Sequence, residues 1–145
     1  MPSAVIEMRD AILAAAEGGR IEELKGVFEL NELPPSLGID QGADPIAHLK
    51  AQSGDGDGKA VLAALIRIIT AGCVSIPTGR DIENNRVFVW PYLAEMDLAH
   101  LPAAHSDALD AVAGKDGADA MRRSGTYAFW KIEIGADGTW HSLAR

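Results

Sequence analysis

Apolar side chains recur at helical spacing in the first part of the chain. The apolar residues between Val5 and Ala16 lie three or four positions apart and Gly18 follows them, which predicts an amphipathic helix over residues 4–17. The same spacing continues from Ile21 to Phe28 and predicts a second, short helix.

Two further helices are predicted before any strand. Asp44-Pro45 begins the third, because the aspartate side chain caps free backbone amides and proline needs no amide at that position. The fourth follows the glycine and aspartate loop at 53–58 and ends at Gly72. Its apolar residues are Val61, Leu62, Leu65, Ile68 and Ile69. This is the most apolar helix of the chain, and we expect it at the centre of the core.

The pattern changes to that of strands after Gly72. Residues 73–76 and 86–90 are rich in β-branched and aromatic side chains and are joined by a polar connection, which predicts two strands. Pro91 ends the second one. Residues 103–112 and 117–123 are predicted to be short helices.

The end of the chain predicts a β-hairpin. From Tyr127 to Ile134 large apolar residues alternate with polar or small ones, as in a half-buried strand. The break that follows contains Asp137-Gly138, whose glycine supplies the positive φ of a tight turn. A second strand is predicted over 139–143, and two of the three tryptophans lie in this hairpin.

Helices first and strands last predict an α+β fold. We expect N-terminal helices packed on a C-terminal antiparallel sheet that ends in the β-hairpin. The length of 145 residues suits one domain and no repeat is present, so residues 1–145 are predicted to fold as a single unit. Adjacent prolines exclude a helix at 31–38, which is predicted to be an ordered loop or a short linker.

Charge and composition narrow the classes of partner. The formal net charge is -8 and the sequence pI is near 4.8, which repels phosphate backbones and anionic lipids, so we expect no nucleic-acid partner. No run approaches the roughly 18 apolar residues of a membrane span, and the chain is predicted to be soluble. Cys73 is the single cysteine, which excludes an internal disulfide and leaves the compartment open.

No motif in the sequence predicts a cofactor or a metal. The loop from Gly54 to Lys59 invites comparison with a phosphate-binding loop, but its spacing is wrong and Ala60 stands where serine or threonine is needed. A calcium loop beginning at Asp55 would need ligands at its fifth and twelfth positions, where the chain has Lys59 and Ile66.

Histidines and candidate nucleophiles give no catalytic pattern either. The four histidines are His48, His100, His105 and His141. No two of them are four residues apart on one helix face, so each is predicted to be solvated or to make a structural hydrogen bond. His141 stands out, because it lies on a predicted strand beside Trp140 and could face a pocket. Cys73 is predicted to be a buried small side chain rather than a reactive thiolate.

Trp90-Pro91-Tyr92 is the strongest candidate for a recognition feature. Its proline stiffens the end of a strand from which two large amphipathic rings emerge, as in sites that stack on flat ligands. The alternative is that Trp90 fills the core and Tyr92 hydrogen-bonds to the backbone. The residues proposed to bind a ligand are Trp90, Tyr92, Trp140 and His141.

Several segments resemble a family of uncharacterised alphaproteobacterial proteins. The resemblance is carried by 87–94, 125–127 and 134–141 and extends to Asp44-Pro45-Ile46 and 53–56, so it spans most of residues 40–143. Members often carry an export signal, which implies a periplasmic or secreted location, with the cytoplasm as the alternative because the chain starts at Met1 without such a signal. The resemblance implies no activity. A weaker, fold-level similarity is to NTF2-like domains, which place helices before a curved sheet that ends in an Asp-Gly-x-Trp hairpin.

Three functions stay open from the sequence. The first is a non-enzymatic module of the bacterial cell envelope that binds a small molecule or a protein around Trp90, Tyr92 and the terminal hairpin. The second is an NTF2-like enzyme in which His141 or another histidine lines a pocket and pairs with an aspartate for acid/base chemistry. The third is a structural or oligomerising domain with a large apolar interface between copies.

Overall fold

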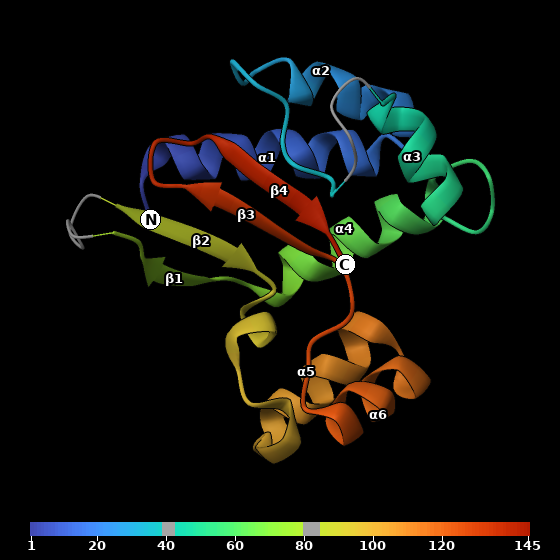
Figure 1. Ribbon diagram of the computed structural model, residues 1–145, viewed down its shortest axis with the longest axis vertical. Coiled ribbons are helices and arrows are strands. Elements are labelled where there is room, and N and C mark those ends of the chain that lie inside the picture. The colour runs from blue at the N-terminus through green and yellow to red at the C-terminus, as the bar shows by residue number, and fades with distance from the viewer. Residues whose placement is uncertain (39–42, 80–84) are drawn as a thin grey trace.

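The fold combines helices with one antiparallel sheet (Figure 1). The structure is a computed structural model and describes residues 1–38, 43–79 and 85–145. The helices before the sheet are α1 (Ser3–Glu17), a 3-10 turn η1 (Ile21–Glu23), α2 (Leu24–Phe28), α3 (Pro45–Gln52) and α4 (Lys59–Ala71). The strands are β1 (Val74–Pro77), β2 (Arg86–Trp90), β3 (Lys131–Gly135) and β4 (Trp140–Ala144). The α+β fold predicted from the sequence is confirmed.

The strands pair in chain order, β1-β2-β3-β4, and every neighbouring pair is antiparallel. Between β2 and β3 the chain leaves the sheet and forms η2 (Tyr92–Glu95), η3 (Leu98–His100), α5 (Ala103–Ala113) and α6 (Lys115–Ser124). These elements lie together below the sheet in Figure 1. The connection between β1 and β2 was predicted to be polar, and residues 80–84 of it lie outside the described part of the chain.

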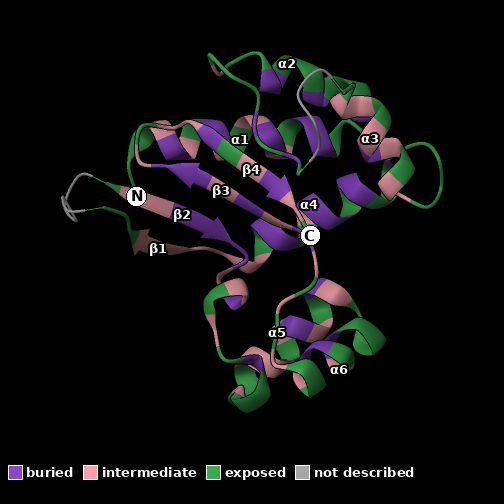
Figure 2. Cartoon of the chain, viewed as in Figure 1, coloured by how far each residue is buried: buried purple, intermediate pink, exposed green. Residues whose placement is uncertain are grey.

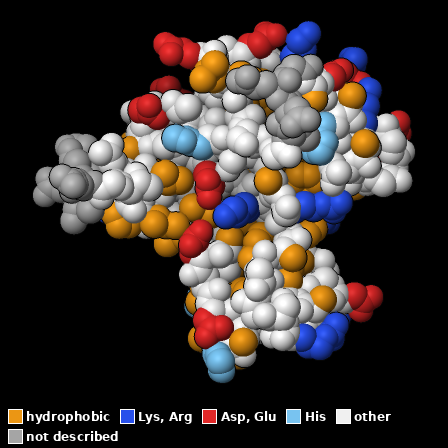
Figure 3. Space-filling model, viewed as in Figure 1, with side chains coloured by type: hydrophobic (Ala, Val, Ile, Leu, Met, Phe, Trp, Pro, Cys, Tyr) orange, Lys and Arg blue, Asp and Glu red, His pale blue; other side chains and the backbone are white. Residues whose placement is uncertain are grey.

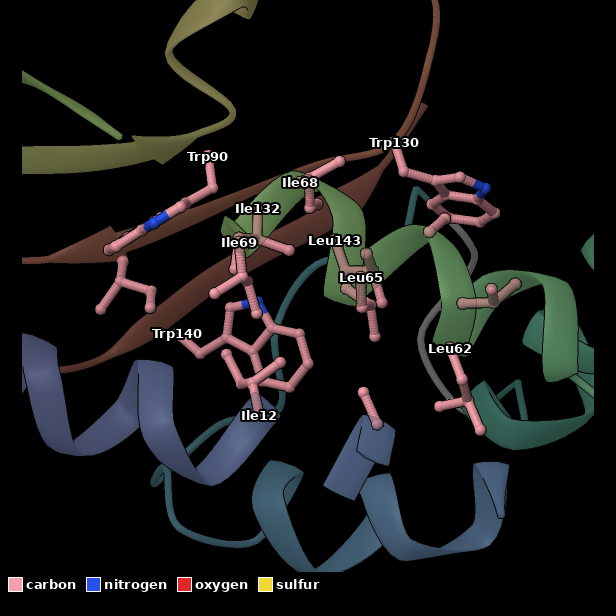
Figure 4. Packing of buried hydrophobic residues seen from close by; sticks show 14 of the residues in the cluster. Ile12, Leu62, Leu65, Ile68, Ile69, Trp90, Trp130, Ile132, Trp140 and Leu143 are labelled. Atoms are coloured by element: carbon pink, nitrogen blue, oxygen red, sulfur yellow. The ribbon is translucent and has the colours of Figure 1, made fainter. Parts of the chain in front are cut away.

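Alternation along the strands directs one face of the sheet to the core. Phe88 pairs with Ile134 and Trp90 with Ile132, and these four side chains lie on the same face. Figure 4 shows Ile132 beside Ile68 and Ile69 of α4. The helix α1 packs against both α4 and β3, so the two long helices cover this face. Figure 2 shows buried positions concentrated where the sheet and these helices meet.

The helix α4 forms the centre of the core, as its apolar pattern predicts. Leu65 and Ile68 are fully buried and belong to the same cluster as Trp130 and Ile132. Local chemistry sets where α3 begins. The Asp44 side chain accepts a hydrogen bond from the backbone N–H of Ile46 at 3.0 Å, and Pro45 occupies the first helical position between them. The cap predicted at Asp44-Pro45 is therefore confirmed.

The terminal hairpin is confirmed, but its first strand begins later than predicted. The strand starts at Lys131, not at Tyr127. The Tyr127 hydroxyl donates to the Trp130 carbonyl at 2.7 Å, and the Ala128 N–H donates to the Met121 sulfur at 3.1 Å. The first bond lies within 127–130, and the second ties this segment to α6. The strand begins later than predicted because the chain must first cross from α6 back to the sheet. Burial raises the pKa of Tyr127 well above its usual range.

Arg122 fixes α6 against α5. One terminal nitrogen of its guanidinium lies 2.7 Å from the Asp110 carboxylate and 2.8 Å from the Ser106 carbonyl, both on α5. The other lies 2.7 Å from Asp119 on its own helix. A planar guanidinium fixes the positions of the acceptors that it binds. The Arg122 contacts therefore hold α5 and α6 in a fixed relative orientation.

Candidate functional site

The four residues predicted to bind a ligand do not form one surface. Trp90 and Trp140 each expose 1% of their area and lie in the core cluster. Figure 4 shows both rings among the buried side chains. Tyr92 is half-buried near α5, whereas His141 is exposed on the outer strand β4. The surface predicted around all four is therefore dispersed.

Tyr92 connects α4 to α5. Its backbone N–H donates to the Gly72 carbonyl at the end of α4, at 2.9 Å. Its hydroxyl lies 2.7 Å from Nδ1 of His105 on α5, and the two rings meet edge to face with centroids 5.3 Å apart. The hydroxyl therefore bonds to an imidazole, not to the backbone as the alternative interpretation of the sequence proposed. The sequence spacing of Tyr92 and His105 does not predict this hydrogen bond, because the path of the chain through η2 and η3 brings the two side chains together.

A groove of about 400 Å³ lies between α4 and α5. On one side it is lined by Ile66, Arg67, Thr70 and Ala71 of α4, and on the other by Ala108, Ala111 and Val112 of α5. The small alanine side chains leave the space open, and nearly all the lining is apolar. The molecule narrows between the sheet and the α5–α6 pair, the region where α4 meets α5 (Figure 3).

Arg67 places a positive charge at one end of this groove. Its Nε donates to the Val112 carbonyl at 3.0 Å, in the last turn of α5, where carbonyls lack helical partners. Its guanidinium carbon lies 5.7 Å from the centroid of the Phe129 ring. No carboxylate of the described residues forms an ion pair with Arg67. The charge is therefore held in place and exposed, without an ion-pair partner among the described residues.

The two ends of the groove differ in chemistry. Arg67 and Val112 mark the charged end. Ala71 and Ala108 mark the other end. Ala71 precedes Gly72 and Ala108 follows His105 by one helical turn, and both Gly72 and His105 hydrogen-bond to Tyr92. The sequence contained one sign of this site, since Arg67 and Thr70 interrupt the most apolar helix of the chain. The position of α5, which makes the opposite wall, is tertiary.

The glycine and aspartate loop before α4 is closed on itself. One carboxylate oxygen of Asp55 accepts from the Ser53 hydroxyl at 2.8 Å and from the backbone N–H groups of Asp57 and Gly58 at 2.9 and 3.0 Å. The other accepts from the Ala60 N–H at 3.0 Å. The carboxylate thus caps α4. In the described part of the chain, no three His, Cys, Asp or Glu side chains are grouped so as to hold a metal ion.

We expect Asp55→Asn to lower the melting temperature by a few degrees at pH 7. The hydrogen bond from the Ser53 hydroxyl, followed by that from the Asp57 N–H, lowers the pKa of Asp55. A lowered carboxyl pKa contributes stability above the ordinary aspartate value of about 3.9, and this contribution is lost as the pH falls through the lowered value. The difference between variant and parent should therefore shrink toward pH 3 in thermal unfolding followed by circular dichroism.

Asp57→Asn is the matched control for this measurement. Asp57 is exposed and its side chain accepts no hydrogen bond within the described residues, so the same loss of charge two positions away should change the melting temperature little. Equal decreases in melting temperature for both variants at pH 7 would mean that the loss of charge alone lowers stability, and would contradict a capping role for Asp55.

His100 bonds to a carboxylate and His141 acts on one through its charge alone, and both histidines are exposed. His100 Nδ1 is 2.8 Å from Asp97, with side chains 81% and 66% exposed, and this hydrogen bond lowers the pKa of Asp97. The charge of His141 helps to lower the pKa of Asp137, after the larger effect of the Thr139 N–H. Neither pair borders the groove between α4 and α5. The enzyme with a pocket His/Asp pair stays a prediction.

Cys73 follows α4 and packs against the core cluster. Burial raises the pKa of its thiol, so the protonated form predominates at neutral pH and the side chain is a poor nucleophile. The poor reactivity agrees with the prediction, but the side chain is half-buried and not buried as predicted.

Comparison with protein-family models, with curated proteins and with solved structures found no match to this chain. Among the described residues, none of the helices has both the length and the apolar character needed to cross a lipid bilayer.

Proposed function

We propose that this chain is a non-enzymatic binding module whose groove between α4 and α5 receives a small amphipathic acid. The observation that carries the proposal is an apolar groove with one unneutralised guanidinium at its end. A volume of about 400 Å³ falls in the range of roughly 300–1,000 Å³ that is typical of small-molecule sites.

The length of the groove limits the apolar part of the ligand. Ile66 and Ala71 are five residues apart on α4, which at 1.5 Å per residue corresponds to roughly 7.5 Å. The alkyl part of a medium-chain acid or a single aromatic ring fits this length. Arg67 offers planar donors suited to a carboxylate, and its Nε bond to Val112 fixes their position. The favoured ligand class is thus a medium-chain or aromatic carboxylic acid.

The proposal includes a location in the bacterial cell envelope. Its support is the resemblance to a family whose members are often exported, and the cytoplasm is the alternative. Fractionation of the tagged product of the native gene, with periplasmic and cytoplasmic marker enzymes measured in parallel, tests this part. Recovery with the cytoplasmic marker would contradict it.

Octanoate is the probe for the groove, with 1-octanol and octylamine as matched neutral and cationic molecules. At one hundred times its dissociation constant a ligand stabilises the folded state by about 2.7 kcal/mol, which for a domain of this size raises the melting temperature by about 5–10 °C. We expect octanoate to give this shift, 1-octanol a smaller one and octylamine none. Equal shifts for all three would contradict recognition of the charge.

Two substitutions separate the charged and apolar parts of the site. Arg67→Gln should weaken octanoate binding about tenfold and leave 1-octanol unchanged, because one charged hydrogen-bonded contact is lost. Ala111→Leu should fill the groove and weaken both. Ala120→Leu, at an exposed alanine of α6 outside the groove, is the control for the added side chain. Titration calorimetry measures all three, and full octanoate affinity in Ala111→Leu would overturn the proposal.

A further inference from the structure

A second hollow lies on the opposite part of the molecule, between α1, the turn after α2 and the β3–β4 turn. Two adjoining spaces of about 490 and 250 Å³ share Met8, Leu30, Asp137 and Gly138, so they form one continuous trough. It shares no lining residue with the groove between α4 and α5. We call it the hairpin trough.

Large apolar side chains are exposed at this trough. Leu30 is 64% and Leu33 76% exposed, and both line it. They are the large hydrophobic residues most open to solvent in the described part of the chain, ahead of Met1 at 54%. Single exposed leucines are common, but two on the rim of one hollow are typical of an interaction surface.

The strand β4 holds these leucines in position. Asn31 lies between them, and its side-chain amide donates to the Trp140 carbonyl at 2.9 Å and accepts from the Trp140 N–H at 3.4 Å. Phe28, just before the turn, contacts the buried Trp140 ring with centroids 5.2 Å apart. A partner would meet a surface that is already ordered, which lowers the entropic cost of binding.

Acidic side chains surround the trough. Glu7 and Asp137 line its smaller space, and Glu32 lines the larger one. None of the three forms an ion pair with a described residue. The Thr139 N–H lowers the pKa of Asp137, which keeps that carboxylate charged. Figure 3 shows acidic side chains over the turn after α2 and over the β3–β4 turn.

We propose that the hairpin trough docks a basic amphipathic segment of a partner protein. Apolar side chains of that segment would lie between Leu30, Leu33 and Met8, and its lysines or arginines would face Glu7, Glu32 and Asp137. A second copy of this chain is disfavoured, because it also carries a net charge of -8 and would bring like charges together. An anionic membrane is disfavoured for the same reason.

The probe is a synthetic fourteen-residue helical peptide of leucine and lysine, labelled for fluorescence anisotropy and compared with its glutamate-for-lysine counterpart. We expect the lysine peptide to bind and the glutamate peptide to fail. Leu30→Ser combined with Leu33→Ser should weaken binding by roughly tenfold or more, because the apolar centre of the contact is lost. Both leucines are exposed, so this variant should keep the fold and bind octanoate as the parent does.

A second pair of variants distinguishes docking from general attraction to an acidic protein. Glu7→Gln with Glu32→Gln should weaken the lysine peptide several-fold, since two facing charges are lost. Glu17→Gln with Glu95→Gln removes the same charge at exposed positions away from the trough and should change the affinity less than twofold.

Three results would overturn the proposal. Equal weakening by both glutamate pairs would mean nonspecific adsorption. Unchanged affinity in the leucine variant would mean that the trough is not the contact. Self-association of the parent that the leucine variant abolishes, measured by sedimentation equilibrium, would assign the surface to a second copy instead. Octanoate binding should be unaffected in all these variants, so failure here leaves the groove between α4 and α5 as a separate question.

Discussion

Trp140→Ala is expected to lower the free energy of unfolding by about 3–5 kcal/mol, the range for removing a fully buried aromatic ring. Trp140 exposes 1% of its area, packs against Phe28 and pairs with Ile134 across the sheet. Figure 4 shows its ring directed toward Ile12 of α1. Its indole N–H also donates to the Ser142 carbonyl at 2.9 Å. The substitution leaves a cavity between the sheet and α1 and removes the indole hydrogen bond.

Urea unfolding followed by circular dichroism measures this loss. Trp140→Phe retains an aromatic ring and should cost less than the alanine variant, because only part of the ring volume and the N–H are removed. His141→Ala, at the next position but exposed, should change stability by less than about 0.5 kcal/mol. A loss below about 1 kcal/mol for Trp140→Ala would mean that the ring is not a core residue, and would restore the interpretation of Trp140 as a ligand-binding surface.

Gly58→Ala is expected to destabilise the protein by about 2–5 kcal/mol through two separate effects. Gly58 has a φ of +85°, in the left-handed region that costs an alanine about 1–2 kcal/mol. A Cβ there would also lie 2.6 Å from the Cβ of Ile21, a fully buried side chain. Because Ile21 has little room to retreat, forced repacking adds about 1–3 kcal/mol.

Gly56→Ala measures the backbone effect alone. Gly56 has a similar φ of +76°, but a Cβ there would meet nothing within 4 Å. Its cost should therefore be that of the backbone alone, about 1–2 kcal/mol. The difference between the two variants in urea unfolding reports the contact between the start of α4 and η1. Equal losses would contradict the close approach of Gly58 to Ile21.

The sequence by itself determined most of the elements, because their causes are local. Helical spacing from Val5 to Ala16 and the apolar run in α4 depend on the period of a single helix. The cap at Asp44 and the positive φ of +88° at Gly138 depend on the chemistry of one or two adjacent residues. The order of these elements was enough to predict the α+β class.

Only the tertiary structure decided which side chains meet. Alternation around Tyr127 is equally compatible with a strand and with the crossing that joins α6 to β3, and the structure has the crossing, in which Tyr127 bonds to the Trp130 carbonyl and Ala128 to the Met121 sulfur. An aromatic pattern cannot distinguish a ring that fills the core from one that stacks on a ligand, and packing placed Trp90 and Trp140 inside. The groove beside Arg67 and the trough held by Asn31 form between segments far apart in the chain. Their geometry follows from how preformed elements dock, which no local pattern specifies.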